Sequence, residues 1–254
     1  MYSTQLSDYK NYDMENLQLE MTDKKTENEP QRIRLITHHL DGTRGDLIFS
    51  TPRLLTFGLQ ELFDRDTHTL IGYQIPLVMW GKNGPTEDEK KFIDIIEKIT
   101  DVSRDFLLEH REELNKPELE RGDLTRLNPL YYKIDKGEVK RDHAPLLYAR
   151  LNTFRNEDAV NIRTLFTDES TKETINPLML LNKRCLIRGA IRLESIVVGA
   201  NSRPRFQMKL FEACVKFLDP GFKSLLEPGK VFPRTKIQKQ QQQQKPAPVE
   251  SSVV

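Results

Sequence analysis

The clearest structural signal in the chain is residues 184–217, RCLIRGAIRLESIVVGANSRPRFQMKLFEACVKF. In two runs, 184–198 and 203–217, polar and apolar side chains alternate with a period of two, as in a β-strand with one buried face. The intervening Gly199-Ala200-Asn201-Ser202 is typical of a turn. The stretch therefore predicts a long β-hairpin with positive side chains on one face and apolar side chains on the other.

The register of this hairpin has an electrostatic consequence. If Val198 pairs with Arg203, Arg192 lies directly opposite Lys209. Like charges that face each other across a sheet destabilise it by a few tenths to ~1 kcal/mol, so we expect a bound anion to relieve them. A phosphate backbone is one candidate. The alternative is that these cations only keep a solvated sheet face soluble or block edge pairing.

The two ends of the chain differ from its middle in composition. Residues 1–30 contain seven acidic and three basic side chains and show no hydrophobic period, whereas residues 227–254 contain five basic and two acidic side chains and Gln240–Gln244. We therefore expect a disordered acidic N-terminal segment at 1–30, a folded domain at 31–226, and a disordered basic, Gln-rich tail at 227–254. No apolar run is long enough to predict a membrane span.

Strand and helix signals follow one another across the expected domain. Stretches rich in branched and aromatic residues predict strands at 33–37, 46–50, 53–62, 70–80, 146–153 and 162–167, and a helical turn at 176–181. Thr86-Glu87-Asp88-Glu89 predicts a capped helix start, and apolar residues at helical spacing extend that helix to about Leu114.

This order predicts a mainly β fold. We expect a small β-barrel of the oligonucleotide-binding (OB) type, with one long inserted helix and disordered termini. A β-sandwich with a capping helix is the alternative.

Cationic and aromatic side chains on the polar strand faces and in loops form a candidate nucleic-acid-binding set. Rings on which bases stack, next to cations that contact phosphates, are typical of proteins that bind single strands. The candidates are Trp80, Tyr131, Tyr132, Lys133, Tyr148, Arg150, Arg188, Arg192, Arg205, Lys209 and Phe211. The alternative is a role in solubility for the cations and in core packing for the rings.

Signals for other chemistry are weak. Adjacent His38 and His39 point to opposite faces of a strand, which disfavours a metal site with Asp41. Cys185 and Cys214 both fall on predicted apolar faces, so we expect reduced core cysteines, with one disulfide as the alternative. We expect no enzymatic activity, no cofactor and no metal.

An ordered series of short motifs carries a family resemblance. The motifs are Thr51-Pro52-Arg53 with Phe57-Gly58, Gly72–Leu77 ending in Trp80, Gly84–Glu87, Leu127–Tyr132, Gly189–Val198 and Gln207–Ala213. Over residues 31–226 the chain resembles a proposed single-stranded-DNA-binding protein family of nucleo-cytoplasmic large DNA viruses, which is similar to phage-type OB-fold single-strand-binding proteins. The resemblance implies sequence-independent binding of single-stranded DNA during viral genome replication, recombination or repair.

The resemblance also implies partners and a location. The partner is single-stranded DNA, and RNA, replication proteins and further copies of the chain are the other candidates. The lack of a long apolar run predicts that the chain does not enter a membrane. The location is the host cytoplasm at the viral factory, the nucleus, or the virion. The basic tail departs from the acidic C-termini with which phage and bacterial single-strand-binding proteins recruit partners. The alternative function is a viral structural or scaffold protein that uses the same barrel for protein contacts.

Overall fold

The computed structural model describes residues 2–23, 26, 29–156, 159–200, 202–218, 222–223 and 231–232. The chain divides into two compact units, Met1–Lys216 and Phe217–Val254. In the second unit, β17 (Phe222–Lys223) pairs with β18 (Val231–Phe232). The rest of the predicted basic, Gln-rich tail lies outside the described residues.

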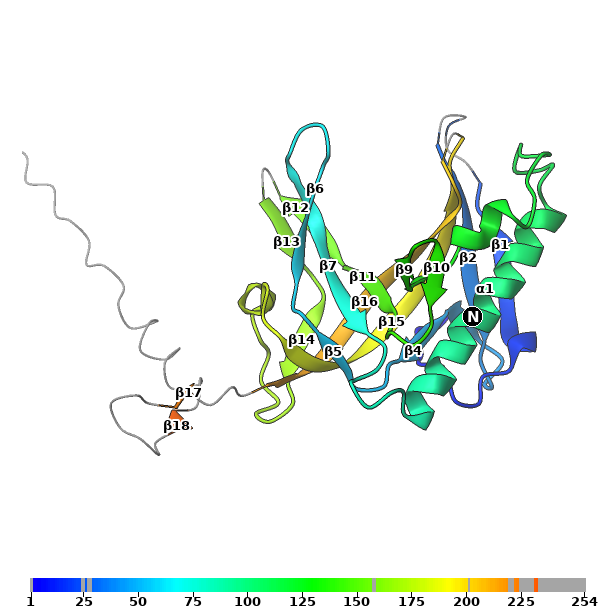
Figure 1. Cartoon of the computed structure of the whole chain (residues 1–254). Coiled ribbons are helices and arrows are strands. Elements are labelled where there is room, and N and C mark those ends of the chain that lie inside the picture. The colour runs from blue at the N-terminus through cyan, green and yellow to red at the C-terminus, as the bar shows by residue number, and fades with distance from the viewer. Residues whose placement is uncertain are drawn as a thin grey trace, which may run out of the picture. The chain divides into compact units, whose positions relative to one another are not determined.

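Five strands of the first unit close into a barrel (Figure 1). They are β5 (Leu54–Thr56), β7 (Leu70–Val78), β11 (Leu146–Leu151), β15 (Cys185–Val198) and β16 (Arg205–Phe217). The ring of pairings runs β5–β7–β11–β16–β15 and returns to β5, and β11 pairs with β16 in parallel. In chain order the ring reads 1-2-3-5-4, which is the Greek-key barrel of the OB fold. The predictions of a mainly β, OB-like fold and of a β15–β16 hairpin are confirmed.

β15 also extends the sheet beyond the barrel. It has 14 residues, long enough at about 3.3 Å per residue to pair with several partners in succession. Along one edge it pairs with β5, then β4 (Ile48–Ser50), then β2 (Gln31–His38). β2 in turn pairs with β1 (Leu17–Met21) and β3 (Arg44–Asp46), so these strands continue the barrel sheet on one side.

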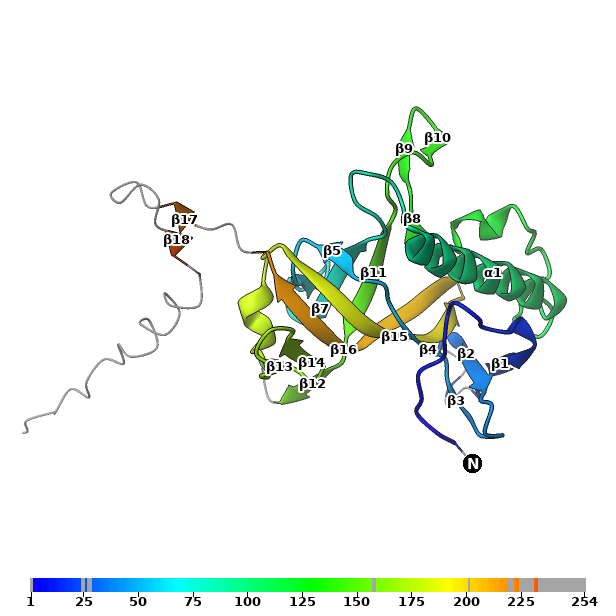
Figure 2. The same ribbon diagram turned by 90° about the horizontal axis from the view of Figure 1, so that it is seen from below.

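The long helix α1 (Glu87–Glu109) starts as predicted. The Thr86 hydroxyl accepts a hydrogen bond from the Glu89 backbone N–H at 3.3 Å, and the Glu89 carboxylate accepts one from the Thr86 N–H at 2.7 Å. Figures 1 and 2 show α1 beside β1 and β2. The regular helix ends at Glu109 rather than at Leu114. Turns follow, in which the Leu114 N–H still donates to the His110 carbonyl, and Asn115 then adopts a left-handed φ of 55°.

Residues 2–23 are folded, which corrects the prediction of disorder for this part of 1–30. Tyr9 is buried edge-to-face against Phe92 of α1, with 5.3 Å between ring centroids, and Tyr12 packs against Phe49 at 5.2 Å. A 3₁₀ turn, η1 (Met14–Asn16), then leads into β1. The sequence did not predict this ordered structure, because the two anchoring rings and the short strand produce no sustained hydrophobic period.

The predicted strand 53–62 is two strands, β5 and β6 (Gln60–Phe63). Gly58 turns the chain between them at a φ of +95°, and a Cβ on Gly58 would lie 2.3 Å from the Leu180 carbonyl oxygen. β6 and β7 pair as an antiparallel hairpin. The remaining elements are β8 (Leu130–Tyr131), β9 (Lys133–Asp135), β10 (Glu138–Lys140), β12 (Thr153–Asn156), β13 (Ala159–Ile162), β14 (Leu165–Asp168), η2 (Asp123–Arg126) and η3 (Pro177–Leu180).

Both cysteines are free, and burial raises the pKa of the Cys185 thiol to about 11. Within the described ranges, no helix is both long and apolar enough to cross a bilayer.

Candidate nucleic-acid interface

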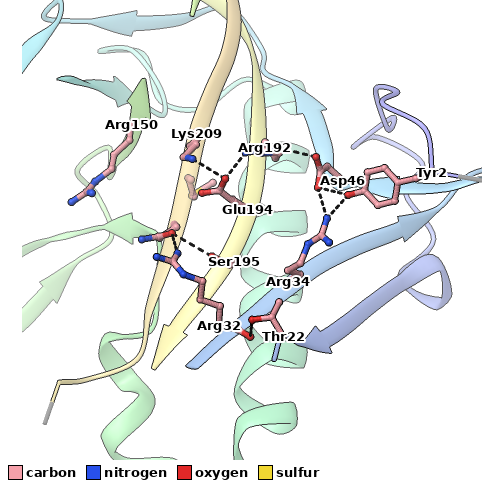
Figure 3. A pocket seen from close by; sticks show the side chains of 12 residues that line it. Tyr2, Thr22, Arg32, Arg34, Asp46, Arg150, Arg192, Glu194, Ser195 and Lys209 are labelled. Carbon is pink, nitrogen blue, oxygen red and sulfur yellow. Dashed lines mark hydrogen bonds and ion pairs between the residues drawn. The ribbon is translucent and has the colours of Figure 1, made fainter. Parts of the chain in front are cut away.

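A pocket of about 570 Å³ lies on the outer face of the sheet, over β2, β15, β16 and β11 (Figure 3). Its charged lining consists of Arg32, Arg34, Asp46, Arg150, Arg192, Glu194 and Lys209. Cations therefore outnumber carboxylates by five to two in this lining.

Strand alternation explains why these side chains share one face. In β2, Arg32 and Arg34 alternate with the buried Ile33 and Leu35, and β15 and β11 show the same alternation. Arg150 of β11 is the direct partner of Lys209 of β16 in the parallel pair, so their side chains leave the sheet on the same side.

Glu194 lies between the two cations that the sequence placed opposite each other. Its carboxylate accepts hydrogen bonds from Arg192 and, at 2.8 Å, from Lys209, and Arg192 also donates to Asp46 at 2.9 Å. This corrects the expectation that Arg192 and Lys209 need an external anion, because the protein supplies the counter-charge itself. The signal was present in the sequence, since Glu194 shares the strand face of Arg192.

Asp46 connects this network to the N-terminal segment. Its carboxylate accepts a hydrogen bond from the Tyr2 hydroxyl, and Arg34 lies 3.4 Å from it. Burial raises the pKa of Asp46, but the Tyr2 hydrogen bond and the Arg192 charge outweigh burial, so the pKa lies below its ordinary value. Burial and the same contact with Asp46 raise the pKa of Tyr2 to about 12. Sequence reasoning missed Tyr2 because it assigned the segment to disorder.

Two of the cations keep their charge uncompensated. Arg32 donates to the neutral Gln207 at 2.7 Å, and Arg150 is exposed. Among the described residues, no carboxylate pairs with either guanidinium. These two side chains can therefore contact an anion without first breaking an internal ion pair.

A pair of tyrosines continues the cationic surface along β11. Tyr131 of β8 and Tyr148 of β11 meet edge-to-face at 5.3 Å, and Tyr131 is 60% exposed. Tyr148 and Arg150 lie on the same side of β11, because Leu147, Ala149 and Leu151 are buried on the other. We call the resulting row the cationic–aromatic face; it consists of Tyr131, Tyr148, Arg150, Lys209, Arg192 and Arg34.

Tyr132 and Lys133 point elsewhere. The Tyr132 hydroxyl donates to Glu97 of α1 at 2.9 Å, and the Arg141 guanidinium lies over its ring at 5.6 Å. Burial and Glu97 together raise the pKa of Tyr132 to about 12. Tyr132 lines a separate hollow between α1 and the β8–β10 region, which Tyr131 also borders. The exposed Lys133 contacts His143 at 3.5 Å.

The other four candidates do not line the cationic pocket. Arg188 is exposed and borders a different hollow, of about 260 Å³, together with Glu212. Arg205 is exposed at the start of β16, Phe211 is 42% exposed further along the same strand, and Trp80 is partly buried after β7. The structure thus unites four predicted residues, Tyr148, Arg150, Arg192 and Lys209, with Tyr131 at the end of the row.

The fold and this face define an OB-barrel protein with a cationic surface on the barrel. The chain belongs to the family described as "Protein of unknown function (DUF2738)", which matches residues 15–250. It is 26% identical over 168 residues to the "Early 31 kDa protein" of Frog virus 3 (isolate Goorha), covering 65% of this chain and 62% of that protein. The chain thus spans less than two thirds of this relative.

The structure is also similar to that of gp2.5, a single-stranded DNA binding protein encoded by bacteriophage T7. The TM-score is 0.41 and the sequence identity 14%, over 72% of this chain and 98% of that chain. One part of the predicted family resemblance is found, namely a weak similarity to a viral early protein. Membership of a single-stranded-DNA-binding family of large DNA viruses stays a proposal.

Proposed function

We propose that the protein binds single-stranded DNA without sequence preference through the cationic–aromatic face. The observation that carries the proposal is the continuity of this face, on which the exposed Tyr131 and the half-buried Tyr148 are followed on the same side by Arg150 and Lys209. β7 and β11 are the second and third strands of the barrel, and OB folds bind oligonucleotides on the face of these strands.

The two components of the face have different physical roles. A base stacked on an exposed ring contributes about 1–3 kcal/mol whatever its identity, because every base has a flat apolar surface. The cations attract the phosphate backbone, again without reading sequence. A duplex hides its base faces in the helical stack, so only a single strand uses both components.

A fluorescence anisotropy titration of the full chain tests the proposal. Labelled single-stranded DNA and a duplex of equal length are compared at about 50 and 200 mM salt, a range over which phosphate contacts weaken strongly. We expect the single strand to bind more tightly at both salt concentrations, with the larger advantage at high salt. Equal or tighter binding of the duplex at the higher salt would refute the proposal.

We further propose that this binding serves viral genome replication, recombination or repair in the viral factory or the nucleus of the host. Similarity to a viral early protein supports a viral role. Replication proteins are the proposed protein partners. A parallel titration with an RNA strand of the same sequence measures whether RNA is also a ligand.

One observation favours the structural or scaffold alternative. Ile134 of β9 and Val139 of β10 face each other across the strand pair and are 67% and 52% exposed. Exposed apolar surface of this kind is typical of protein contacts. If the wild-type chain fails to bind single strands, and if Ile134→Ser with Val139→Ser abolishes self-association in sedimentation velocity runs, the alternative holds.

A further inference from the structure

The N-terminal residues are built into the sheet beside the cationic pocket. The Ser3 backbone N–H donates to the Arg44 carbonyl at 2.8 Å, and the Ser7 N–H donates to the Ile48 carbonyl at 2.7 Å. At Gly45 the fit is so close that a Cβ would lie 1.8 Å from the Ser3 carbonyl oxygen. These contacts hold the segment along β3 and β4 and bring its first aromatic residue to the pocket.

That residue is Tyr2, which lines the cationic pocket and remains 45% exposed. Figure 3 shows its hydroxyl directed at Asp46 and Arg34. Arg34 donates to the hydroxyl at 2.6 Å, and the Arg34 guanidinium lies 5.5 Å from the ring centroid. The hydroxyl contacts fix where the ring lies, while nearly half of the residue stays open to solvent.

We propose that Tyr2 is a second base-stacking platform of the single-strand site, at the opposite end of the face from Tyr131 and Tyr148. The inference rests on the proposed function and adds to it the binding element at the far end of the site. A single strand would then stack on rings at both ends and lay its phosphates over the cations between them.

The dimensions of the face agree with this arrangement. From β8 to β3 the path crosses β11, β16, β15 and β2. Five spacings of about 4.8 Å between neighbouring strands give roughly 24 Å. OB folds engage about 4–16 nucleotides each, so a strand near the lower limit would occupy one end of the face, and a longer one would reach both.

The contrast with the neighbouring tyrosines separates this role from simple anchoring. Tyr9 is 6% exposed and packed against Phe92, and Tyr12 packs against Phe49 and donates to Thr37 at 2.8 Å. These two rings fasten the segment to the body of the protein. The Tyr2 ring makes its charged contacts on the side that faces the pocket.

The test measures affinity for oligothymidylates of about 4 and about 12 nucleotides, the range of OB site sizes. Tyr2→Ala should weaken binding of the long strand by about fivefold or more and leave the salt dependence unchanged, since it removes a stack and no phosphate contact. Binding of the short strand, seated on the two rings at the other end, should change by less than about twofold. Tyr2→Phe keeps the stacking ring but loses the hydroxyl contacts that position it, so its affinity should lie nearer to that of the wild type than to that of Tyr2→Ala.

Two further variants control for structural damage. Leu6→Ala removes an exposed apolar side chain from the same segment, outside the cationic pocket, and should leave both affinities unchanged. Tyr2→Leu retains bulk without an aromatic ring, and it replaces Tyr2→Ala if a thermal melt shows that the alanine variant does not fold.

The outcomes are distinguishable. If the wild type binds single strands but Tyr2→Ala and Tyr2→Leu bind the long strand normally, the inference is overturned and the proposed function stands. An equal loss for both strand lengths, or a Tyr2→Phe variant as weak as Tyr2→Ala, also overturns the inference, because Tyr2 would then act as a structural pin. Absence of single-strand binding by the wild type refutes the proposed function and the inference with it.

Discussion

At the scale of single residues, Glu194 controls how much positive charge the face presents. Its carboxylate occupies the position between Arg192 and Lys209 that a phosphate would otherwise take. Of its two ion pairs, the one with Lys209 is the more exposed, with side chains 32% and 23% exposed, so an incoming phosphate can replace this pair more readily than the pair with Arg192. Under the proposed function, we therefore expect the internal carboxylate to tune affinity rather than to prevent binding.

We therefore predict that Glu194→Gln binds single-stranded DNA up to about fivefold more tightly than the wild type. The slope of log affinity against log salt should steepen by about 0.7 for each additional phosphate that the released cations neutralise. Titrations at several salt concentrations measure both quantities. Glu212→Gln, which removes an exposed carboxylate from β16 outside the pocket, is the matched control, and a weaker Glu194→Gln variant would contradict the prediction.

Asp46 links the N-terminal segment to the sheet through charge, which makes that link dependent on pH. Because its pKa is lowered in the folded protein, its contribution to stability is fully present above the unfolded pKa of about 4 and is lost as the pH falls through the lower folded pKa. At pH 7, Asp46→Asn should lower the free energy of unfolding by about 1–3 kcal/mol. The variant should therefore melt at a lower temperature than the wild type.

The difference between Asp46→Asn and the wild type should shrink as the pH falls from about 4 through the lower folded pKa, below which the wild-type carboxyl is neutral as well. Thermal melts across this pH range provide the measurement. Asp66→Asn, an exposed loop substitution, serves as the control. A constant difference at all pH values would show that Asp46 acts through shape rather than charge.

At the scale of elements, β11 carries both components of the proposed site on one short strand. Tyr148 and Arg150 are two residues apart on its outer side, so substitutions there separate stacking from charge without moving to another element. Tyr148→Ala should weaken single-strand binding by about 1–3 kcal/mol at a constant salt slope. Arg150→Ala should flatten the slope by about 0.7.

Titrations of both variants over a range of salt concentrations distinguish the two effects. Lys91→Ala, which removes an exposed cation from α1, should change neither affinity nor slope. Identical effects of Tyr148→Ala and Arg150→Ala on affinity and slope would mean that β11 contributes only to folding, and thermal melts of the same samples would show it.

At the scale of the whole molecule, charge is unevenly distributed along a chain whose net charge is only +1. Residues 227–254 contribute five basic and two acidic side chains. Truncation after residue 226 should weaken binding to duplex DNA more than binding to single strands, because duplex binding depends on phosphate attraction alone. Parallel titrations of both chains with both ligands check this. Unchanged affinities for both ligands would assign the tail no part in DNA binding, and an equal loss for both would contradict the prediction.

The sequence by itself determined the features that depend only on residues close together in the chain. Alternation along residues 184–217 determined the β15–β16 hairpin, since a strand with one buried face must alternate. Thr86 and Glu89 determined the start of α1, because the capping box forms within four consecutive residues. The same alternation put Arg192, Lys209, Tyr148 and Arg150 on outward strand faces.

Tertiary structure alone decided which of those faces meet. The closure of the barrel brings Arg150 beside Lys209, and the pairing of β2 with β15 brings Arg34 to Arg192, across more than 150 residues of chain. The order of the N-terminal segment and the placement of Tyr2 depend likewise on Phe92, Phe49 and Gly45, far along the sequence. Contacts of this kind leave no period or motif within a local window, because they exist only once distant strands have paired.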